Sequence, residues 1–149
     1  MSEDTISIAR RLLQVLMPLG KSVTAELRHT GQLMAPGHYQ TLGTLYLRSA
    51  NLSDLAETQG VSLPTMSSTV TSLEQQGWVK RRRSEVDRRV VMVELTPDGC
   101  DKLGDLTDTV LTMLVELLKT KTPAERESLS AGISVLESIF DTISLPKDV

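Results

Sequence analysis

The segment from Lys80 to Arg89, KRRRSEVDRR, concentrates positive charge within an acidic chain. Six of the 16 lysines and arginines lie in these ten positions beside two acids, which gives the segment a net charge of +4. The other ten basic residues face 17 acids, so the rest of the chain carries a net charge of −7. A local positive patch on a repulsive body is typical of a protein with a localised anionic partner. Charge alone leaves a second interpretation open, a solvated arginine-rich hairpin without a partner.

A second group of chemically useful side chains precedes the basic segment. After Ser62, the apolar residues Met66, Val70 and Leu73 recur at intervals of three or four, which predicts a helix with one buried face. The opposite face then carries mostly hydroxyl and amide groups, from Pro64, Thr65, Ser67, Ser68, Thr71, Ser72 and Gln75. Such groups can contact base edges or phosphates, and a threonine methyl can meet a thymine methyl. Any one of these residues also fits an ordinary solvated surface.

Several classes of function are disfavoured by what the sequence lacks. It shows no glycine-rich phosphate loop, no paired catalytic carboxylates and no nucleophile with a histidine partner, so we do not expect an enzyme. One cysteine and two histidines make a poor metal-ligand set, and we expect neither metal nor cofactor. The single cysteine excludes an intramolecular disulfide and is typical of a reducing cytoplasm. Four aromatic residues are too few for the stacking platforms of single-stranded nucleic-acid binding.

The elements that position these groups can be predicted from the same stretch. Ser53 is a plausible N-cap for a short helix that ends before Gly60, and Ser62 is the N-cap of the next helix, which ends at Gly77. Two short helices joined by a tight turn containing glycine form a helix-turn-helix.

From Trp78 onward the apolar period changes from 3.6 to 2, which predicts a hairpin with residues 84–89 at its tip. A helix-turn-helix followed directly by a basic hairpin is a winged helix. Strand alternation separates Arg81 and Arg83 from Lys80 and Arg82, so about half of these side chains can face one partner.

Both ends of the chain predict long amphipathic helices. The first carries an apolar stripe from Ile8 to Leu27, and Pro18 inside it predicts a kink or a break. Thr96 begins another helix as its N-cap, and Thr122 with Glu125 forms a capping box before the last one. No stretch approaches the roughly 18 apolar residues of a membrane span, and we expect no signal peptide or membrane partner.

The sequence therefore predicts a mainly α fold with a small β-hairpin wing, of the α+β class. We expect an N-terminal dimerisation helix over 1–33, a winged helix-turn-helix DNA-binding lobe over 34–96, and C-terminal dimerisation helices over 97–149. The terminal helices carry more apolar surface than a compact winged helix needs, which favours a homodimer. A monomer in which these helices fold back onto the winged helix is the alternative.

The order of motifs between Leu52 and Gly99 resembles the MarR family of multiple antibiotic resistance type regulators. The matching elements are Leu55-Ala56, Gly60-Val61-Ser62, Leu73-Glu74 to Gly77, Asp87-x-Arg89 and Leu95-Thr96 to Gly99. Each element is common by itself, but the ordered set at these spacings is specific, and the likeness extends over nearly the full chain. The sequence departs from the family at Ser68 and Ser72, where arginine is frequent, so strong guanine readout from this helix is doubtful.

The resemblance implies a homodimeric repressor on a pseudo-palindromic double-stranded DNA operator. It implies a recognition helix in the major groove and Arg89 in the minor groove, oriented by an ion pair with Asp87. The expected wing contacts are Arg81, Arg83, Asp87, Arg88 and Arg89. The alternative function is a winged helix used as a protein-interaction module without specific DNA binding.

The resemblance also implies a small effector that weakens DNA binding. A pocket for an aromatic or anionic molecule is expected near the junction of the lobes, with His29, His38, Tyr39 and Tyr46 as candidate residues. A second interpretation stays open, in which Tyr39 and Tyr46 simply pack the second helix.

Overall fold

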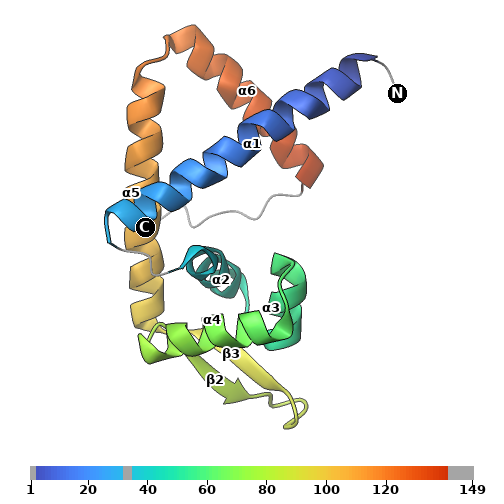
Figure 1. Ribbon diagram of the computed structural model, residues 1–149, viewed down its shortest axis with the longest axis vertical. Coiled ribbons are helices and arrows are strands. Elements are labelled where there is room, and N and C mark those ends of the chain that lie inside the picture. The colour runs from blue at the N-terminus through green and yellow to red at the C-terminus, as the bar shows by residue number, and fades with distance from the viewer. Residues whose placement is uncertain (1–2, 32–34, 141–149) are drawn as a thin grey trace.

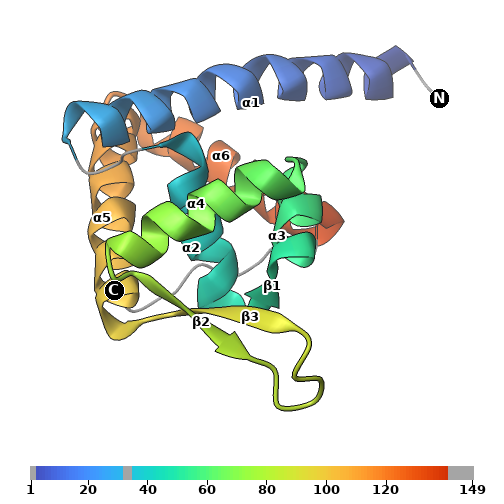
Figure 2. The same cartoon turned by 60° about the horizontal axis from the view of Figure 1, so that its bottom comes forward.

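The computed structural model describes residues 3–31 and 35–140 and confirms the mainly α fold with a hairpin wing. The elements follow in the order α1 (Glu3–His29), α2 (Pro36–Leu47), β1 (Ala50–Asn51), α3 (Leu52–Gln59), α4 (Leu63–Gln75), β2 (Val79–Arg83), β3 (Val91–Leu95), α5 (Pro97–Lys119) and α6 (Pro123–Phe140). Helices α2, α3 and α4 and the sheet form a lobe at one end, and α5 leads from it to α6 (Figure 1). Helix α1 and the wing lie on opposite sides of this lobe in both views (Figures 1 and 2).

One hydrophobic core holds the lobe together. The predicted inward face of α4 is confirmed, since Met66, Val70 and Leu73 are all buried. The core also receives side chains from the end of α1 and the first half of α5. Its buried hydrophobic members are Leu27, Leu42, Leu45, Ala50, Leu55, Ala56, Met66, Val70, Leu73, Val79, Val93, Leu103, Leu106 and Val110. Within the lobe, α4 packs against α3, α2 and β2.

The helix-turn-helix forms as predicted, with one corrected cap. Ser62 is the N-cap of α4, and its hydroxyl accepts a hydrogen bond from the Thr65 N–H at 3.2 Å. Gly60 ends α3 in the left-handed region with φ of 62°. The N-cap of α3 is Asn51, not Ser53, because the chain leaves β1 at Asn51 with the extended dihedrals that a cap requires. The Asn51 side chain accepts from the Asp54 N–H at 2.8 Å.

The sheet contains a strand that the sequence did not indicate. Its order is β1-β3-β2, and both pairs are antiparallel. β2 and β3 form the predicted hairpin, in register from Val79 opposite Leu95 to Arg83 opposite Val91. The Ser84 N–H donates to the Val90 carbonyl at 2.9 Å at the base of the tip. β1 adds Ala50 beside Val93 and so anchors the wing to the start of the helix-turn-helix.

The terminal helices are long and largely exposed. α1 continues through Pro18, so the predicted break is absent. Gln14, whose carbonyl loses its N–H partner, is exposed and accessible to water. The capping box at the start of α6 is confirmed, with the Thr122 N–H donating to the Glu125 carboxylate at 2.8 Å. This hydrogen bonding lowers the pKa of Glu125. No helix within the described ranges is long and apolar enough to cross a membrane.

A tight joint connects the end of α4 to the start of α5. The Thr96 N–H donates to the Trp78 carbonyl at 3.0 Å, and its hydroxyl donates to the Gly77 carbonyl at 2.6 Å. The same hydroxyl accepts from the Gly99 N–H at 3.0 Å, which confirms Thr96 as the N-cap. Gly99 is buried, and a Cβ atom there would lie 2.0 Å from the Trp78 carbonyl oxygen. The helix start therefore depends on glycine at this position.

Replacing Gly99 by alanine is expected to destabilise the fold, although alanine is the better helix former. The new methyl group must displace backbone, which we expect to cost at least about 2 kcal/mol in the free energy of unfolding. Gly43→Ala in α2 is the matched control, because nothing lies within 4 Å of its Cβ position. That change should be neutral or stabilise by up to about 1 kcal/mol. Urea denaturation of the three proteins measures both effects, and equal midpoints for Gly99→Ala and wild type would contradict the joint.

Candidate nucleic-acid interface

The solvent face of α4 presents most of the predicted recognition residues. Pro64, Thr65, Ser68, Thr71 and Gln75 are exposed, whereas Ser67 and Ser72 are half-buried. The Thr65 hydroxyl lies 2.8 Å from the Ser62 hydroxyl and so belongs to the helix cap. The exposed residues of α4 that do not belong to its cap are therefore mainly Ser68, Thr71 and Gln75.

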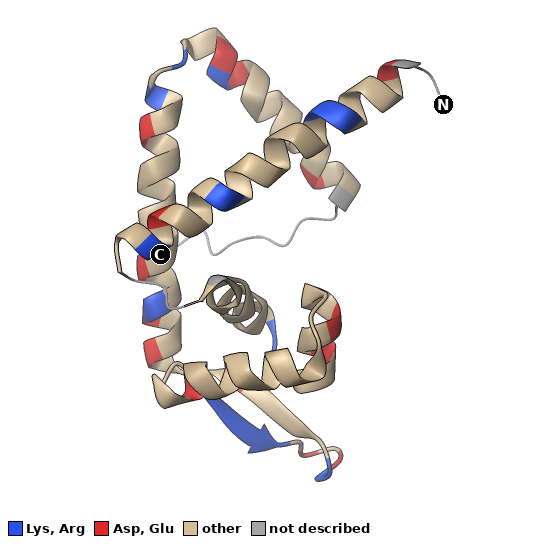
Figure 3. Cartoon of the chain, viewed as in Figure 1, with Lys and Arg blue, Asp and Glu red and all other residues tan. Residues whose placement is uncertain are grey.

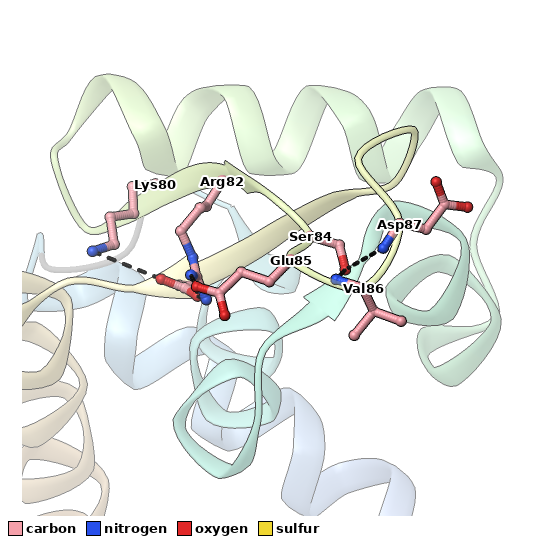
Figure 4. Close-up of polar contacts among 7 residues, drawn as sticks. Lys80, Arg82, Ser84, Glu85, Val86 and Asp87 are labelled. Carbon is pink, nitrogen blue, oxygen red and sulfur yellow. Dashed lines mark hydrogen bonds and ion pairs between the residues drawn. The ribbon is translucent and has the colours of Figure 1, made fainter.

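The basic strand β2 is less available than its charge suggests. Lys80 Nζ lies 3.7 Å from a Glu94 carboxylate oxygen. Arg82 contacts the same carboxylate at 2.7 Å through Nη2 and Glu85 at 2.8 Å through Nη1 (Figure 4). These carboxylates raise the pKa of Arg82. The outward-facing cations of β2 are thus already paired within the wing.

Arg81 belongs to the other face of the strand and is paired as well. Its Nη1 donates to the Glu74 carboxylate, and its Nη2 donates to the Thr71 hydroxyl at 3.2 Å. Three of the six basic residues of the segment, Lys80, Arg81 and Arg82, therefore have carboxylate partners in the folded protein. The partners Glu74 and Glu94 lie outside the ten-residue basic segment. The net charge of that segment therefore overstates how many of its cations are free of an ion pair.

Three arginines of the wing remain without a carboxylate partner among the residues that the structure describes: Arg83, Arg88 and Arg89. Arg83 and Arg88 line a shallow hollow of about 480 Å³ at the base of the tip, together with Arg82, Ser84 and Glu85. Basic residues follow β2 and the tip of the wing at the end of the lobe distant from α1 (Figure 3). Unpaired guanidinium groups at an exposed tip can bind phosphates or enter a narrow minor groove.

Asp87 shapes the tip through the backbone. Its carboxylate accepts from the Arg89 N–H at 2.9 Å, and its carbonyl accepts from the Val90 N–H at 2.9 Å. The Ser84 hydroxyl accepts from the N–H groups of Val86 and Asp87 at 3.2 and 3.4 Å (Figure 4). The expected ion pair between the side chains of Asp87 and Arg89 is not among the ion pairs of the described residues. Asp87 therefore fixes the turn that carries Arg89 through the backbone, and its carboxylate does not bind the Arg89 guanidinium group.

Val86 lies in the predicted tip but was not among the wing residues expected to contact DNA. Its side chain is 99% exposed between the acidic residues of the loop. Apolar tip residues can pack against sugars or base edges in the minor groove. The only signal in the sequence was its central place in the loop SEVDRR.

The structure places the four candidate effector residues in different environments. His29 is the exposed last residue of α1, His38 is buried in the first turns of α2, and Tyr39 packs against the core. Tyr46 is exposed and lines a separate hollow of about 360 Å³ with Leu45, Arg48, Ser49, Glu94, Leu95 and Cys100. The packing interpretation therefore holds for Tyr39, while Tyr46 remains accessible to a ligand.

Burial of His38 predicts a pH-dependent stability. Its Nδ1 atom has no hydrogen-bond partner within the part of the chain that the structure describes, and burial lowers the pKa of His38 from its ordinary 6.5. The unfolded chain therefore binds an extra proton as the pH falls below about 6.5, and the free energy of unfolding should decrease there. His38→Leu should remove this loss, whereas His29→Gln should keep it. Denaturation midpoints measured between neutral and mildly acidic pH test this; an unaltered pH dependence in His38→Leu would contradict the assignment.

Comparison with known proteins shows a family match over part of the chain. The MarR family model matches residues 37–91, which run from the start of α2 to the first residue of β3. The crystal structure of wild-type apo MarR from E. coli superposes with a TM-score of 0.75 at 21% identity, covering 89% of this chain and 95% of that one. This chain is therefore similar to the MarR family over its helix-turn-helix segment and shares the fold of MarR. The crystal structure of RV1404 from Mycobacterium tuberculosis shares the fold with a TM-score of 0.82 at 20% identity, over 98% of this chain and 100% of that one.

The curated relatives of this chain are named as regulators. YfiV of Bacillus subtilis (strain 168), an uncharacterized HTH-type transcriptional regulator, is 35% identical over 90 residues, or 60% of this chain and 56% of the relative. The HTH-type transcriptional repressor YetL of the same organism is 22% identical over 138 residues, 89% of this chain and 81% of the relative. The chain spans about half the length of the first two curated relatives. These relatives are named as transcriptional regulators, in agreement with the expectation that the chain is not an enzyme.

Proposed function

We propose that this chain is a MarR-family transcriptional regulator that binds a specific double-stranded DNA operator as a homodimer in the cytoplasm. The observation that carries the proposal is that α4, with its exposed hydroxyl and amide groups, packs beside β2 of the wing. In that wing Arg83, Arg88 and Arg89 have no carboxylate partner among the described residues. A helix of this length fits the major groove, and the adjacent hairpin can then reach the neighbouring minor groove.

The two surfaces divide the work of recognition. Ser68, Thr71 and Gln75 read base edges in the major groove, with discrimination limited by the lack of bidentate arginine on α4. Arg89, carried by the Asp87 turn, enters an A·T-rich minor groove, where the negative potential is concentrated. Arg83 and Arg88 contact phosphates and set the register of the protein on the duplex.

The terminal segments 1–33 and 97–149 supply the dimer interface, and each 34–96 lobe binds one half-site of a pseudo-palindrome. The support is a set of exposed large apolar residues on the three terminal helices. They are Ile6, Ile8, Leu13, Val15, Leu16, Met17 and Leu19 of α1, Leu111, Val115 and Leu117 of α5, and Leu129, Ile133, Val135 and Ile139 of α6. Apolar surface of this extent on one protomer favours burial against a second copy.

Repression relieved by a small aromatic or anionic effector completes the proposed function. The name of the relative YetL, a repressor, supports the sign of regulation. The hollow beside Tyr46 offers a phenol and the Arg48 guanidinium to such a molecule. An effector bound there would contact α2, β3 and, at Cys100, the start of α5, and so couple a terminal helix to the wing.

Selection of bound fragments from the source genome tests this function. The full-length protein is incubated with sheared genomic DNA at moderate salt, and retained fragments are sequenced. We expect a few intergenic fragments that share an inverted repeat with A·T-rich flanks. Recovery of no common sequence would overturn specific DNA binding and favour the protein-interaction alternative.

A further inference from the structure

We propose that Arg81 of β2 is a specificity-determining positioning residue, which completes a recognition surface shared between α4 and the wing. The inference rests on the proposed DNA-binding function. α4 carries no lysine or arginine of its own between Leu63 and Gln75. The strand supplies the missing guanidinium from outside the helix.

The geometry of Arg81 differs from that of its neighbours on β2. Arg81 pairs with Val93 in the sheet and lies on the same strand face as the buried Val79, so its side chain turns toward the helices. Only 27% of the Arg81 side chain is exposed, compared with 60% for Lys80 and 51% for Arg82. Arg81 is therefore held against the protein, whereas its two neighbours project outward.

Arg81 donates hydrogen bonds to two side chains on one face of α4. Thr71 and Glu74 are three residues apart, so they are neighbours on the helix surface. One guanidinium nitrogen donates to the Glu74 carboxylate, and the other donates to the Thr71 hydroxyl at 3.2 Å. A planar fork can hold both acceptors at once, which the single ammonium of lysine cannot do in the same geometry.

This contact fixes the hydrogen-bonding polarity of Thr71. Its hydroxyl oxygen accepts from the guanidinium, and its own hydrogen is then left to donate. The nearby positive charge also disfavours the approach of a second donor, such as a base amino group. Thr71 is therefore expected to select acceptors in the major groove, namely N7 or O6 of guanine, N7 of adenine or O4 of thymine.

Arg81 also makes Glu74 compatible with a DNA surface. The Glu74 side chain is 39% exposed beside the recognition face, where a bare carboxylate would be repelled by phosphates. The guanidinium offsets this charge and orients the carboxylate, which can accept a hydrogen bond from the amino group of cytosine. The pair thus gives a helix without basic residues a fixed donor and a fixed acceptor.

Selection from randomised duplexes tests the inference with the full-length protein. We compare wild type, Arg81→Lys and the matched control Arg82→Lys, which changes a paired arginine on the opposite face of the same strand. Arg81→Lys keeps the charge but loses the fork, so we expect its affinity for mixed-sequence DNA to stay within about twofold. Its preference at one or two base pairs of each half-site should fall roughly tenfold. Arg82→Lys should keep the wild-type preference.

Three further variants separate positioning from folding and from charge. Thr71→Val should lose the preference at the same base pair as Arg81→Lys. Arg81→Met leaves Glu74 unneutralised and should weaken binding to all duplexes, and Arg81→Met combined with Glu74→Gln should restore mixed-sequence affinity without restoring the preference. An unchanged preference in Arg81→Lys or in Thr71→Val would overturn the inference while leaving the proposed function intact. If wild type itself enriches no sequence, the proposed function fails and the inference fails with it.

Discussion

Arg89→Ala is expected to lower operator affinity by at least about thirtyfold, while the dimer stays intact. An arginine that contacts bases is worth about 1–3 kcal/mol per site, and a dimer on a palindrome loses two such contacts. Arg89 can supply this contact because the Asp87 carboxylate binds only its backbone N–H and leaves the guanidinium unpaired among the described residues. The expected loss of operator affinity therefore depends on Arg89 having no ion pair among the described residues of the wing.

The matched control for Arg89→Ala is Arg82→Ala, which removes the same side chain from the same hairpin. Arg82 is held by Glu94 and Glu85, and exposed pairs of this kind contribute at most about 1 kcal/mol. We expect its operator affinity to stay within about threefold of wild type. Gel-shift titrations on one A·T-flanked operator measure both variants, and size-exclusion chromatography checks the dimer. Equal losses for the two variants would refute the division of the wing into paired and unpaired arginines.

Leu16→Asp in α1 is expected to produce a monomer whose operator affinity is at least about a hundredfold lower. The Leu16 side chain is exposed on one protomer and lines a hollow of about 630 Å³ with Met17, Gly20, Lys21, Thr24, Ala25 and Arg28. A carboxylate placed in an apolar dimer interface would be desolvated without a partner. Loss of the second lobe removes the avidity of binding two half-sites, which is typically 10²–10⁴.

Gln14→Asp is the control for Leu16→Asp, because it places the same charge on the polar side of the same helix. Gln14 is exposed and lies outside the apolar stripe of α1. Light scattering should show a dimer for wild type and Gln14→Asp and a monomer for Leu16→Asp. A dimeric Leu16→Asp protein with wild-type affinity would show that α1 does not contribute to the interface.

The sequence predicted those parts of the fold that depend on neighbouring residues. The buried face of α4 follows from its period, and the caps at Ser62, Thr96 and Thr122 follow from hydroxyls placed directly before helical turns. The strand β1 could not be predicted, because two residues show no alternation. Its pairing with β3 depends on chain segments some 40 positions apart. That pairing also moved the cap of α3 from Ser53 to Asn51.

The sequence predicted where the candidate site lies, but not which of its basic side chains form ion pairs. Charge counted along the chain identified the wing, since its cations are adjacent in sequence. The antiparallel register then places Glu94 opposite Lys80, and the packing of β2 on α4 places Glu74 beside Arg81. Neither contact can be predicted without the register and the helix position. The conformation of the tip, in which Asp87 accepts from a backbone N–H, is likewise a property of the folded loop.

The salt dependence of operator binding tests the central claim most directly. Arg83, Arg88 and Arg89, which have no carboxylate partner among the described residues, bring about six cations of a dimer to the duplex, and each contributes about −0.9 to the slope of log K against log salt concentration by releasing counterions. Titration of wild type on its operator across about 50–300 mM salt should therefore give a slope near −5. A slope near zero would contradict DNA binding through the wing and would favour a protein partner instead.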